Sequence, residues 1–124
     1  MHDAGKAINT LLTIKEANMK KTDLLVIGGS AGGLLAATMA RKAYEDDIDI
    51  TLIRETERVM VPCGIPYIYG TLQDLKKNMI PDTMLTATNV NLLIDKVLKI
   101  DRERKTASTE GNVTLNYKKL VIAT

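Results

Sequence analysis

The stretch Leu24-Leu25-Val26-Ile27-Gly28-Gly29-Ser30-Ala31-Gly32-Gly33 decides the fold of this chain. Its first four residues are a short, wholly apolar run, which is typical of a strand buried on both faces of a parallel sheet. The glycine cluster predicts a tight turn, and residues 34–44 are rich in Ala, Leu and Met, which favour a helix. A polar turn at 45–47 leads to a second predicted strand at 48–53. This β-turn-α-β order is the opening of a doubly wound α/β sheet.

The glycine cluster also predicts a dinucleotide site. Gly28, Ser30 and Gly33 occupy the three glycine positions of the pattern G-x-G-x-x-G. The first position makes a tight turn, the second lets the backbone approach a pyrophosphate, and the third lets the helix pack on the strand. The phosphates then lie at the helix N-terminus, where unpaired N–H groups point at them. Ser30 in place of the middle glycine weakens the fingerprint, and a glycine-rich turn without a ligand is the alternative. The candidate cofactor-binding residues here are Gly28, Gly29, Ser30, Ala31, Gly32 and Gly33.

A carboxylate at the end of the second strand is expected to bind the ribose hydroxyls of such a nucleotide. Glu55 is the nearest candidate, and we favour it over Glu57. Arg54 is an alternative end of the strand, but a guanidinium cannot accept a hydrogen bond from a hydroxyl. A solvated loop charge is the other interpretation of both glutamates.

The rest of the chain predicts short elements. Pro62, Gly64, Pro66 and Gly70 allow only a short helix in their segment. Pro81-Asp82-Thr83 indicates the start of a short helix over residues 84–88. Turn residues then separate a third parallel strand, an antiparallel meander of three strands and a last apolar strand. These strands are expected at residues 91–94, then 96–101, 106–109 and 113–117, and finally 120–124.

Composition excludes several classes of function. The 124 residues carry a formal net charge of +2, which is too small and scattered for a nucleic-acid surface. With four Tyr and no Phe or Trp, a base-stacking platform is also disfavoured. One Cys and one His permit neither an internal disulfide nor a zinc site with several thiolates. No apolar run reaches the ~20 residues of a membrane span, and we expect a cytoplasmic protein.

Residues 1–22 differ in character from the rest of the chain. They indicate a weak helix ending at Lys20-Lys21, with the first strong strand beginning only at Asp23. Met19 followed by Lys-Lys-Thr-Asp resembles an ordinary protein start. We therefore predict an N-terminal extension over 1–22, either a translated leader from a misassigned start or a real helix. Residues 23–124 are predicted to be the N-terminal part of a nucleotide-binding domain.

The segment Val61-Pro62-Cys63-Gly64-Ile65-Pro66-Tyr67 is the most specific part of the sequence. A lone cysteine is usually a small buried hydrophobe. Here two prolines and a glycine indicate a fixed backbone at a helix start, where helix N-termini stabilise a thiolate. Such a thiolate beside a flavin could exchange electrons with it. Cys63 is therefore the candidate redox residue.

Three motifs together resemble the pyridine-nucleotide disulfide oxidoreductases, in particular the coenzyme A-disulfide reductases, NADH oxidases and sulfur reductases with a single redox cysteine. They are the glycine loop, the segment Cys63–Tyr67, and the ending Tyr117-Lys118-Lys119-Leu120-Val121-Ile122-Ala123-Thr124. The last is similar to the element Y-D-x-L-x-x-A-T-G, with Lys118 in place of Asp. The resemblance covers about residues 23–124, and no C-x4-C pair is present for glutathione-reductase-like chemistry.

The resemblance implies an α/β, Rossmann-like FAD/NAD(P)-binding fold, incomplete in this chain, with a parallel sheet and a small antiparallel β-meander. It implies FAD bound by the glycine loop, Glu55, Pro62, Ala123 and Thr124, and NAD(P)H acting as electron donor through a domain absent from this chain. It also implies a full-length homodimer in which Cys63 cycles between thiolate and an oxidised form. The substrate would be a small-molecule disulfide, persulfide or oxygen.

One position helps to choose among the subtypes. Peroxidases and many oxidases of this group carry a histidine inside the glycine loop, where this chain has Ala31. Alanine there favours the reductases of coenzyme A disulfide, persulfide or sulfur, with an oxygen-reducing NADH oxidase as the alternative. We expect the 124-residue chain to be inactive alone. A non-catalytic nucleotide-binding remnant, and a plain NAD-binding module, are further alternatives.

Overall fold

The computed structural model describes residues 6–7 and 19–124 of the chain. A six-stranded sheet in the order β5-β2-β1-β8-β7-β6 forms the body of the molecule. Strands β5, β2, β1 and β8 run parallel, and β7 and β6 continue the sheet in antiparallel fashion. The expected α/β class, a largely parallel sheet with antiparallel strands, is therefore confirmed. The strands are β1 (Met19–Ile27), β2 (Ile50–Arg54), β5 (Asn91–Ile94), β6 (Val97–Asp101), β7 (Thr106–Thr109) and β8 (Thr114–Ile122).

Strand β1 begins at Met19 and not at Asp23, so the weak helix predicted to end at Lys20-Lys21 is wrong for residues 19–21. The first four residues of β1 pair in parallel with β8, from Met19 beside Thr114 to Thr22 beside Tyr117. The local sequence does not favour a strand here, but β8 supplies the backbone hydrogen bonds that make these residues one. Most of the residues before Met19, for which a translated leader is one of the two predictions, lie outside the described residues.

Strand β8 corrects a second prediction. The strands expected at 113–117 and 120–124 are one continuous strand, because Lys118 and Lys119 do not interrupt it. Its first part pairs antiparallel with β7 and its whole length pairs parallel with β1. The meander is therefore an extension of the parallel sheet and not a separate layer.

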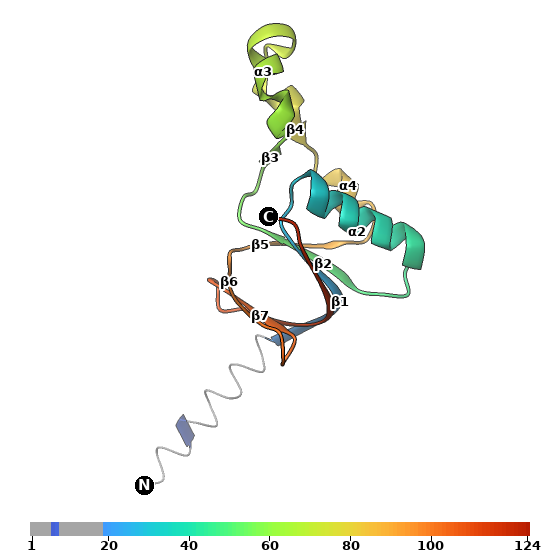
Figure 1. Cartoon of the computed structure of the whole chain (residues 1–124), viewed down its shortest axis with the longest axis vertical. Helices are drawn as coiled ribbons and strands as arrows, with labels where there is room; N and C mark the ends of the chain where they lie inside the picture. Colours follow the sequence, from blue (N-terminus) through green and yellow to red (C-terminus); the bar gives the residue numbers. More distant parts are fainter. Residues whose placement is uncertain (1–5, 8–18) are drawn as a thin grey trace.

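Helices α2 (Ala31–Tyr44) and α4 (Thr83–Thr86) cover one face of the sheet (Figure 1). They bury one apolar cluster, which includes Val26, Leu52 and Leu85. On the other face the sheet curls, so that β5 leads almost directly into β6 and encloses a second cluster around Leu25, Ile53 and Leu115. Alternate residues of β1 and β2 thus serve the two cores, as the apolar runs predict. None of the described helices is long and apolar enough to cross a membrane.

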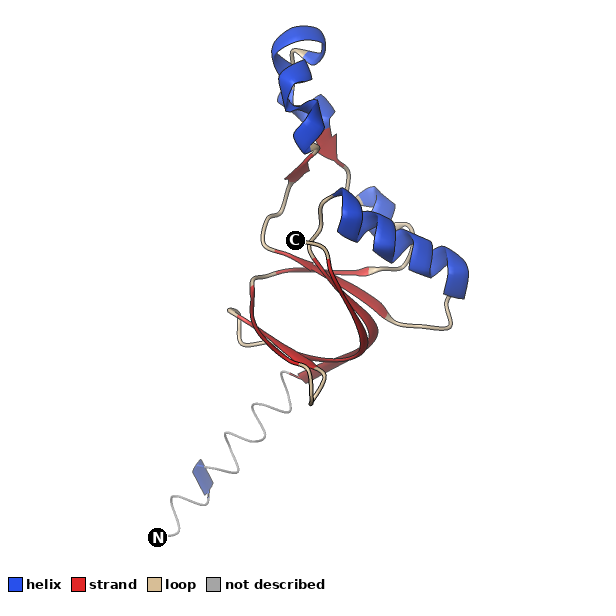
Figure 2. Cartoon of the chain, in the orientation of Figure 1, coloured by secondary structure: helices blue, strands red, loops and turns tan. Residues whose placement is uncertain are grey.

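The segment 59–80 forms a separate projection, which we call the Cys63 lobe (Figure 2). Its base is a two-stranded antiparallel sheet of β3 (Val59–Met60) and β4 (Met79–Ile80), which the sequence did not predict. Between them lie the short helical turns η1 (Pro62–Gly64), α3 (Ile65–Tyr67), η2 (Ile68–Leu72) and η3 (Leu75–Asn78). The predicted short helix in this segment is thus present as a chain of turns.

Candidate functional site: a pocket at the carboxyl ends of the parallel strands

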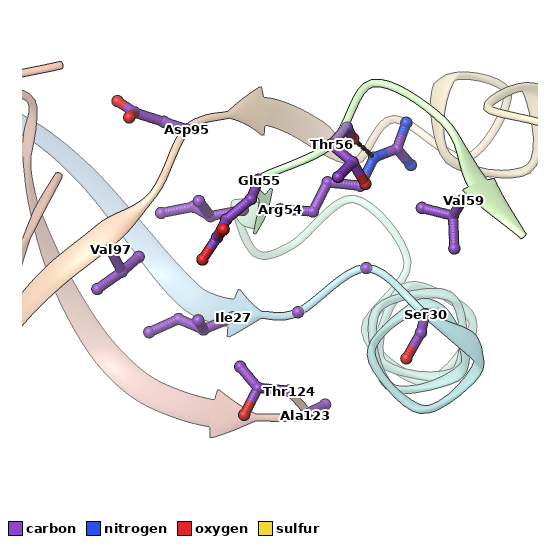
Figure 3. Close-up of a pocket in the computed structure, with 13 residues that line it drawn as sticks. Ile27, Ser30, Arg54, Glu55, Thr56, Val59, Asp95, Val97, Ala123 and Thr124 are labelled. Atoms are coloured by element: carbon purple, nitrogen blue, oxygen red, sulfur yellow. Dashed lines mark hydrogen bonds between the residues drawn. The ribbon is translucent and has the colours of Figure 1, made fainter. Parts of the chain in front are cut away.

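A pocket of about 300 Å³ opens where β1, β2 and β8 end (Figure 3). Strands β2 and β8 lie on opposite sides of β1, so the strand order reverses at this point. Open α/β sheets bind ligands at such a switch point. The volume is at the lower end of the range for small-molecule sites. The lining residues are Ile27, Gly28, Gly29, Ser30, Ile53, Arg54, Glu55, Thr56, Val59, Asp95, Val97, Ala123 and Thr124.

At two glycines of the loop, a side chain would collide with backbone atoms. Gly28 has a φ of +107°, and a Cβ there would lie 2.2 Å from the backbone oxygen of Ala123. A Cβ on Gly33 would lie 1.8 Å from the backbone oxygen of Gly28, so this glycine lets α2 pack against the loop. Of the predicted loop residues, Gly28, Gly29 and Ser30 line the pocket. Ala31, Gly32 and Gly33 do not, because they belong to the first turn of α2.

The N-terminus of α2 is open to an anion. The helix has 14 residues, no acidic side chain lies in its first turn, and the Ser30 side chain makes no capping hydrogen bond. The first N–H groups of a helix have no partner within it and carry partial positive charge. They therefore suit the phosphates of a nucleotide bound against Gly28–Ser30.

The structure distinguishes between the two candidate ribose carboxylates. Glu55 lines the pocket, and its side chain extends toward Ile27 and Val97 (Figure 3). Glu57 lies outside this pocket and lines a second hollow beside β4. Arg54 lines the pocket too, but its guanidinium extends toward Thr56, away from Glu55 (Figure 3).

Seven residues of the lining were not among the predicted site residues: Ile27, Ile53, Arg54, Thr56, Val59, Asp95 and Val97. Asp95 follows β5, so its place at the carboxyl end of a parallel strand was the available signal. Its carboxylate accepts hydrogen bonds from the backbone N–H groups of Lys96 (2.7 Å) and Gly111 (3.2 Å). Asp95 therefore ties the β5–β6 link to the turn before β8.

Cys63 is an exposed free thiol in the first turn of the helical segment that begins at Pro62. Neither Cys63 nor Pro62 lines the pocket, so the structure does not bring them together with the glycine loop in one cavity. Asn78, which sequence reasoning missed, is buried beneath this turn and donates a 2.9 Å hydrogen bond from Nδ2 to the Val61 oxygen. A Cβ on Gly64 would lie 1.9 Å from Oδ1 of Asn78. Asn78 and Gly64 therefore fix the backbone that carries Cys63.

Comparison with known protein families shows the family of the chain. The family described as pyridine nucleotide-disulphide oxidoreductase matches residues 22–124. The chain belongs to this family. Its members are flavin-dependent oxidoreductases that use FAD and NAD(P)H. The family and the sheet topology thus agree with the expectations drawn from the glycine loop, the cysteine segment and the Ala-Thr ending.

Individual members of the family match only in part. The chain is 31% identical over 109 residues to an NADH oxidase of Methanocaldococcus jannaschii, covering 81% of this chain and 24% of the relative. It is 32% identical over 88 residues to an NAD(P)H coenzyme A polysulfide/persulfide reductase of Pyrococcus horikoshii, covering 68% and 19%. The sulfide:quinone oxidoreductase structure from Aquifex aeolicus aligns with a TM-score of 0.74 and 27% identity, covering 85% and 24%. The chain thus spans about a quarter or less of the length of these proteins.

The pocket residues fit the adenosine diphosphate part of FAD, the flavin cofactor of this pyridine nucleotide-disulphide oxidoreductase family. The turn at Gly28 has no side chain, and a Cβ there would collide with the Ala123 backbone. The α2 N-terminus offers N–H donors to phosphate oxygens. Glu55 lines the same pocket, and a carboxylate is the kind of group that accepts hydrogen bonds from ribose hydroxyls. Ala123 and Thr124 close the side opposite Glu55 (Figure 3).

Proposed function

We propose that this chain is the FAD-binding part of an NAD(P)H-dependent flavin oxidoreductase in which Cys63 is the single redox cysteine. The observation that carries the proposal is the pocket at the switch point, which combines the Gly28–Ser30 turn, an uncapped helix N-terminus and Glu55. In this assignment the turn binds the pyrophosphate and Glu55 accepts from the ribose. Ala31, Gly32 and Gly33 support the turn from α2. Pro62 fixes the backbone that enters the Cys63 turn.

Cys63 performs the thiol chemistry in this proposal. Its Sγ attacks one sulfur of a small-molecule disulfide, forming a mixed disulfide and releasing one thiolate. Two electrons and a proton then cleave that mixed disulfide, which restores the Cys63 thiolate and releases the second thiol. Held at the Gly28–Ser30 turn and Glu55, FAD would supply this two-electron chemistry, with NAD(P)H as the source of the hydride. The exposure of Cys63 gives a disulfide free access to Sγ.

The substrate that we favour is coenzyme A disulfide, a coenzyme A persulfide or sulfur. The absence of a histidine at Ala31 and the similarity to the Pyrococcus horikoshii reductase support this choice. Oxygen reduction is the second candidate, because the Methanocaldococcus jannaschii relative is named an NADH oxidase. We propose further that the full-length protein is a cytoplasmic homodimer and that the 124-residue chain does not turn over alone.

Gel filtration of the purified chain with FAD tests the cofactor assignment. We expect flavin absorbance to co-elute with the chain and to be lost in Gly28→Ala, since a Cβ would strike the Ala123 oxygen. Gly70→Ala is the matched control, because a Cβ at Gly70 meets nothing within 4 Å. If the wild-type protein elutes without flavin, the chain is better interpreted as a non-catalytic remnant.

Reoxidation of the reduced, FAD-loaded chain tests the role of Cys63, with coenzyme A disulfide added under anaerobic conditions and oxygen added in a separate reaction. Coenzyme A disulfide should reoxidise the flavin in the wild-type chain and not in Cys63→Ser. Oxygen should reoxidise both, because that reaction at the flavin does not need a disulfide exchange. Equal rates with coenzyme A disulfide in the two chains would remove Cys63 from the reaction and favour the oxidase alternative.

A further inference from the structure

Arg54 occupies an unusual position at the end of β2. Its side chain is only 3% exposed, although arginine is rarely buried without full pairing. Its Nε donates to the backbone oxygen of Thr56 (2.8 Å), and its Nη2 donates to that of Glu57 (2.7 Å). The same Nη2 forms an ion pair with Oδ1 of Asp82 at 2.6 Å.

These partners stand at the two connections of the Cys63 lobe. Thr56 and Glu57 precede β3, where the chain enters the lobe, and Asp82 follows β4, where the chain leaves it. In Figure 1 the lobe extends from the body through these two connections. Among the described elements, those of the lobe pack chiefly against one another. The orientation of the lobe therefore depends on what holds its two connections.

The stem of Arg54 also contacts the glycine loop. A Cβ on Gly29 would lie 2.5 Å from Cδ and 2.9 Å from Cβ of Arg54, so the arginine packs directly over this glycine. One side chain thus contacts the loop assigned to the pyrophosphate, the entry to the lobe and its exit. Arg54 occupies the space that a side chain at Gly29 would need.

We propose that Arg54 is a positioning residue that fixes the Cys63 lobe relative to the glycine loop. The inference rests on the proposed function in one respect: fixing the lobe would hold the Cys63 thiol in a set position relative to the flavin. A guanidinium suits this task because its planar fork donates several hydrogen bonds in fixed directions. A lysine would supply the charge without the fork.

The test measures the placement directly and needs no cofactor. Cys63 is the single cysteine, so Lys42→Cys, at an exposed position of α2, gives a chain with two spin-label sites. Double electron–electron resonance measures the distance between the labels at positions 42 and 63. In the chain with no further change, this distance should have one narrow distribution. In Arg54→Met, which keeps an apolar stem, we expect that distribution to shift or broaden. Arg54→Lys should restore it only in part.

Three further variants make the result decisive. Asp82→Asn removes the ion pair from a residue whose side chain is 45% exposed, so it keeps the test available if Arg54→Met does not fold. Gly29→Ala should also shift or broaden the distribution, because the new methyl group displaces the arginine stem. Arg104→Met, at a side chain that is 85% exposed, is the matched control and should leave the distribution unchanged.

The outcomes separate this inference from the proposed function. A narrow, unshifted distribution in folded Arg54→Met and Asp82→Asn would overturn the positioning role, whatever the chain does with FAD. A broadened distribution in both, with the wild-type chain unable to bind FAD, would support the positioning role and refute the cofactor assignment. Circular dichroism of each variant confirms that the comparison is made on folded protein.

Discussion

The close approach of α2 to the glycine loop makes a quantitative prediction for Gly33→Ala. The new Cβ would lie 1.8 Å from the Gly28 oxygen, whereas ordinary van der Waals contact begins near 3.4 Å. The obstacle is backbone, so the helix or the loop must move by more than 1 Å. Overpacking of this kind costs about 1–3 kcal/mol, and a stiff partner puts the cost near the upper end.

Helix propensity acts in the opposite direction. Replacing a helical glycine by alanine stabilises a helix by about 1 kcal/mol. The net expectation for Gly33→Ala is therefore a loss of about 2 kcal/mol in the free energy of unfolding. Gly32→Ala is the matched control in the same turn, because its nearest neighbour would be the Ala123 Cβ at 3.9 Å. That variant should gain up to about 1 kcal/mol.

Urea unfolding followed by circular dichroism measures both variants. With a slope of about 1–3 kcal/mol per molar urea, the unfolding midpoint of Gly33→Ala should lie at least about 1 M below that of Gly32→Ala. Equal midpoints would refute the reasoning, since they would mean that α2 does not pack closely against Gly28. If Gly32→Ala unfolded at a lower urea concentration than the wild-type chain, Gly32 too would have to be closely packed in the first turn of α2.

Three further results are expected. Leu52→Ala, at a fully buried side chain, should lower the unfolding free energy by about 2–5 kcal/mol in urea titrations, and a smaller loss would indicate a loosely packed core. Glu55→Ala should weaken FAD binding by about 10- to 100-fold in fluorescence titrations, with Glu57→Ala unchanged, because a hydrogen bond to a charged group contributes about 1.5–3 kcal/mol. The hydrogen bond from Lys118 holds the pKa of Asp23 below its ordinary 3.8, so the stabilisation is present above that pH and is lost as pH falls through the folded-state pKa. Asp23→Asn should therefore be less stable than wild type at neutral pH and equal to it in strong acid, and a deficit independent of pH would contradict this assignment.

Local patterns were sufficient for much of the body of the molecule. The strands at Asn91–Ile94 and Thr106–Thr109 have the predicted bounds, because short apolar or β-branched runs between turn residues define them locally. The start of β1 could not be predicted in this way. Residues 20–22 are polar, and only the pairing of residues 19–22 with β8, far along the chain, makes them part of a strand.

In the candidate site too, some features could be predicted from the sequence and others depend on the tertiary structure. The pocket and Glu55 follow from the rule that ligands bind at the carboxyl ends of parallel strands, and this rule needs only the order of elements. Asn78 beneath the Cys63 turn and the contacts of Arg54 depend on the tertiary arrangement of the lobe. No periodicity or motif in the sequence places Asn78 beside Gly64, or Arg54 beside Asp82.

The position of β8 has a consequence for biosynthesis. This strand lies in the middle of the sheet, yet its partner β1 is some 95 residues earlier, as in the pair Met19 and Thr114. While the chain leaves the ribosome, β1 and β2 can pair, but the other side of β1 stays an unpaired edge until β8 has been made. Exposed edges of this kind invite association with other chains. Folding of this segment in the cell thus depends on how quickly its last strand arrives.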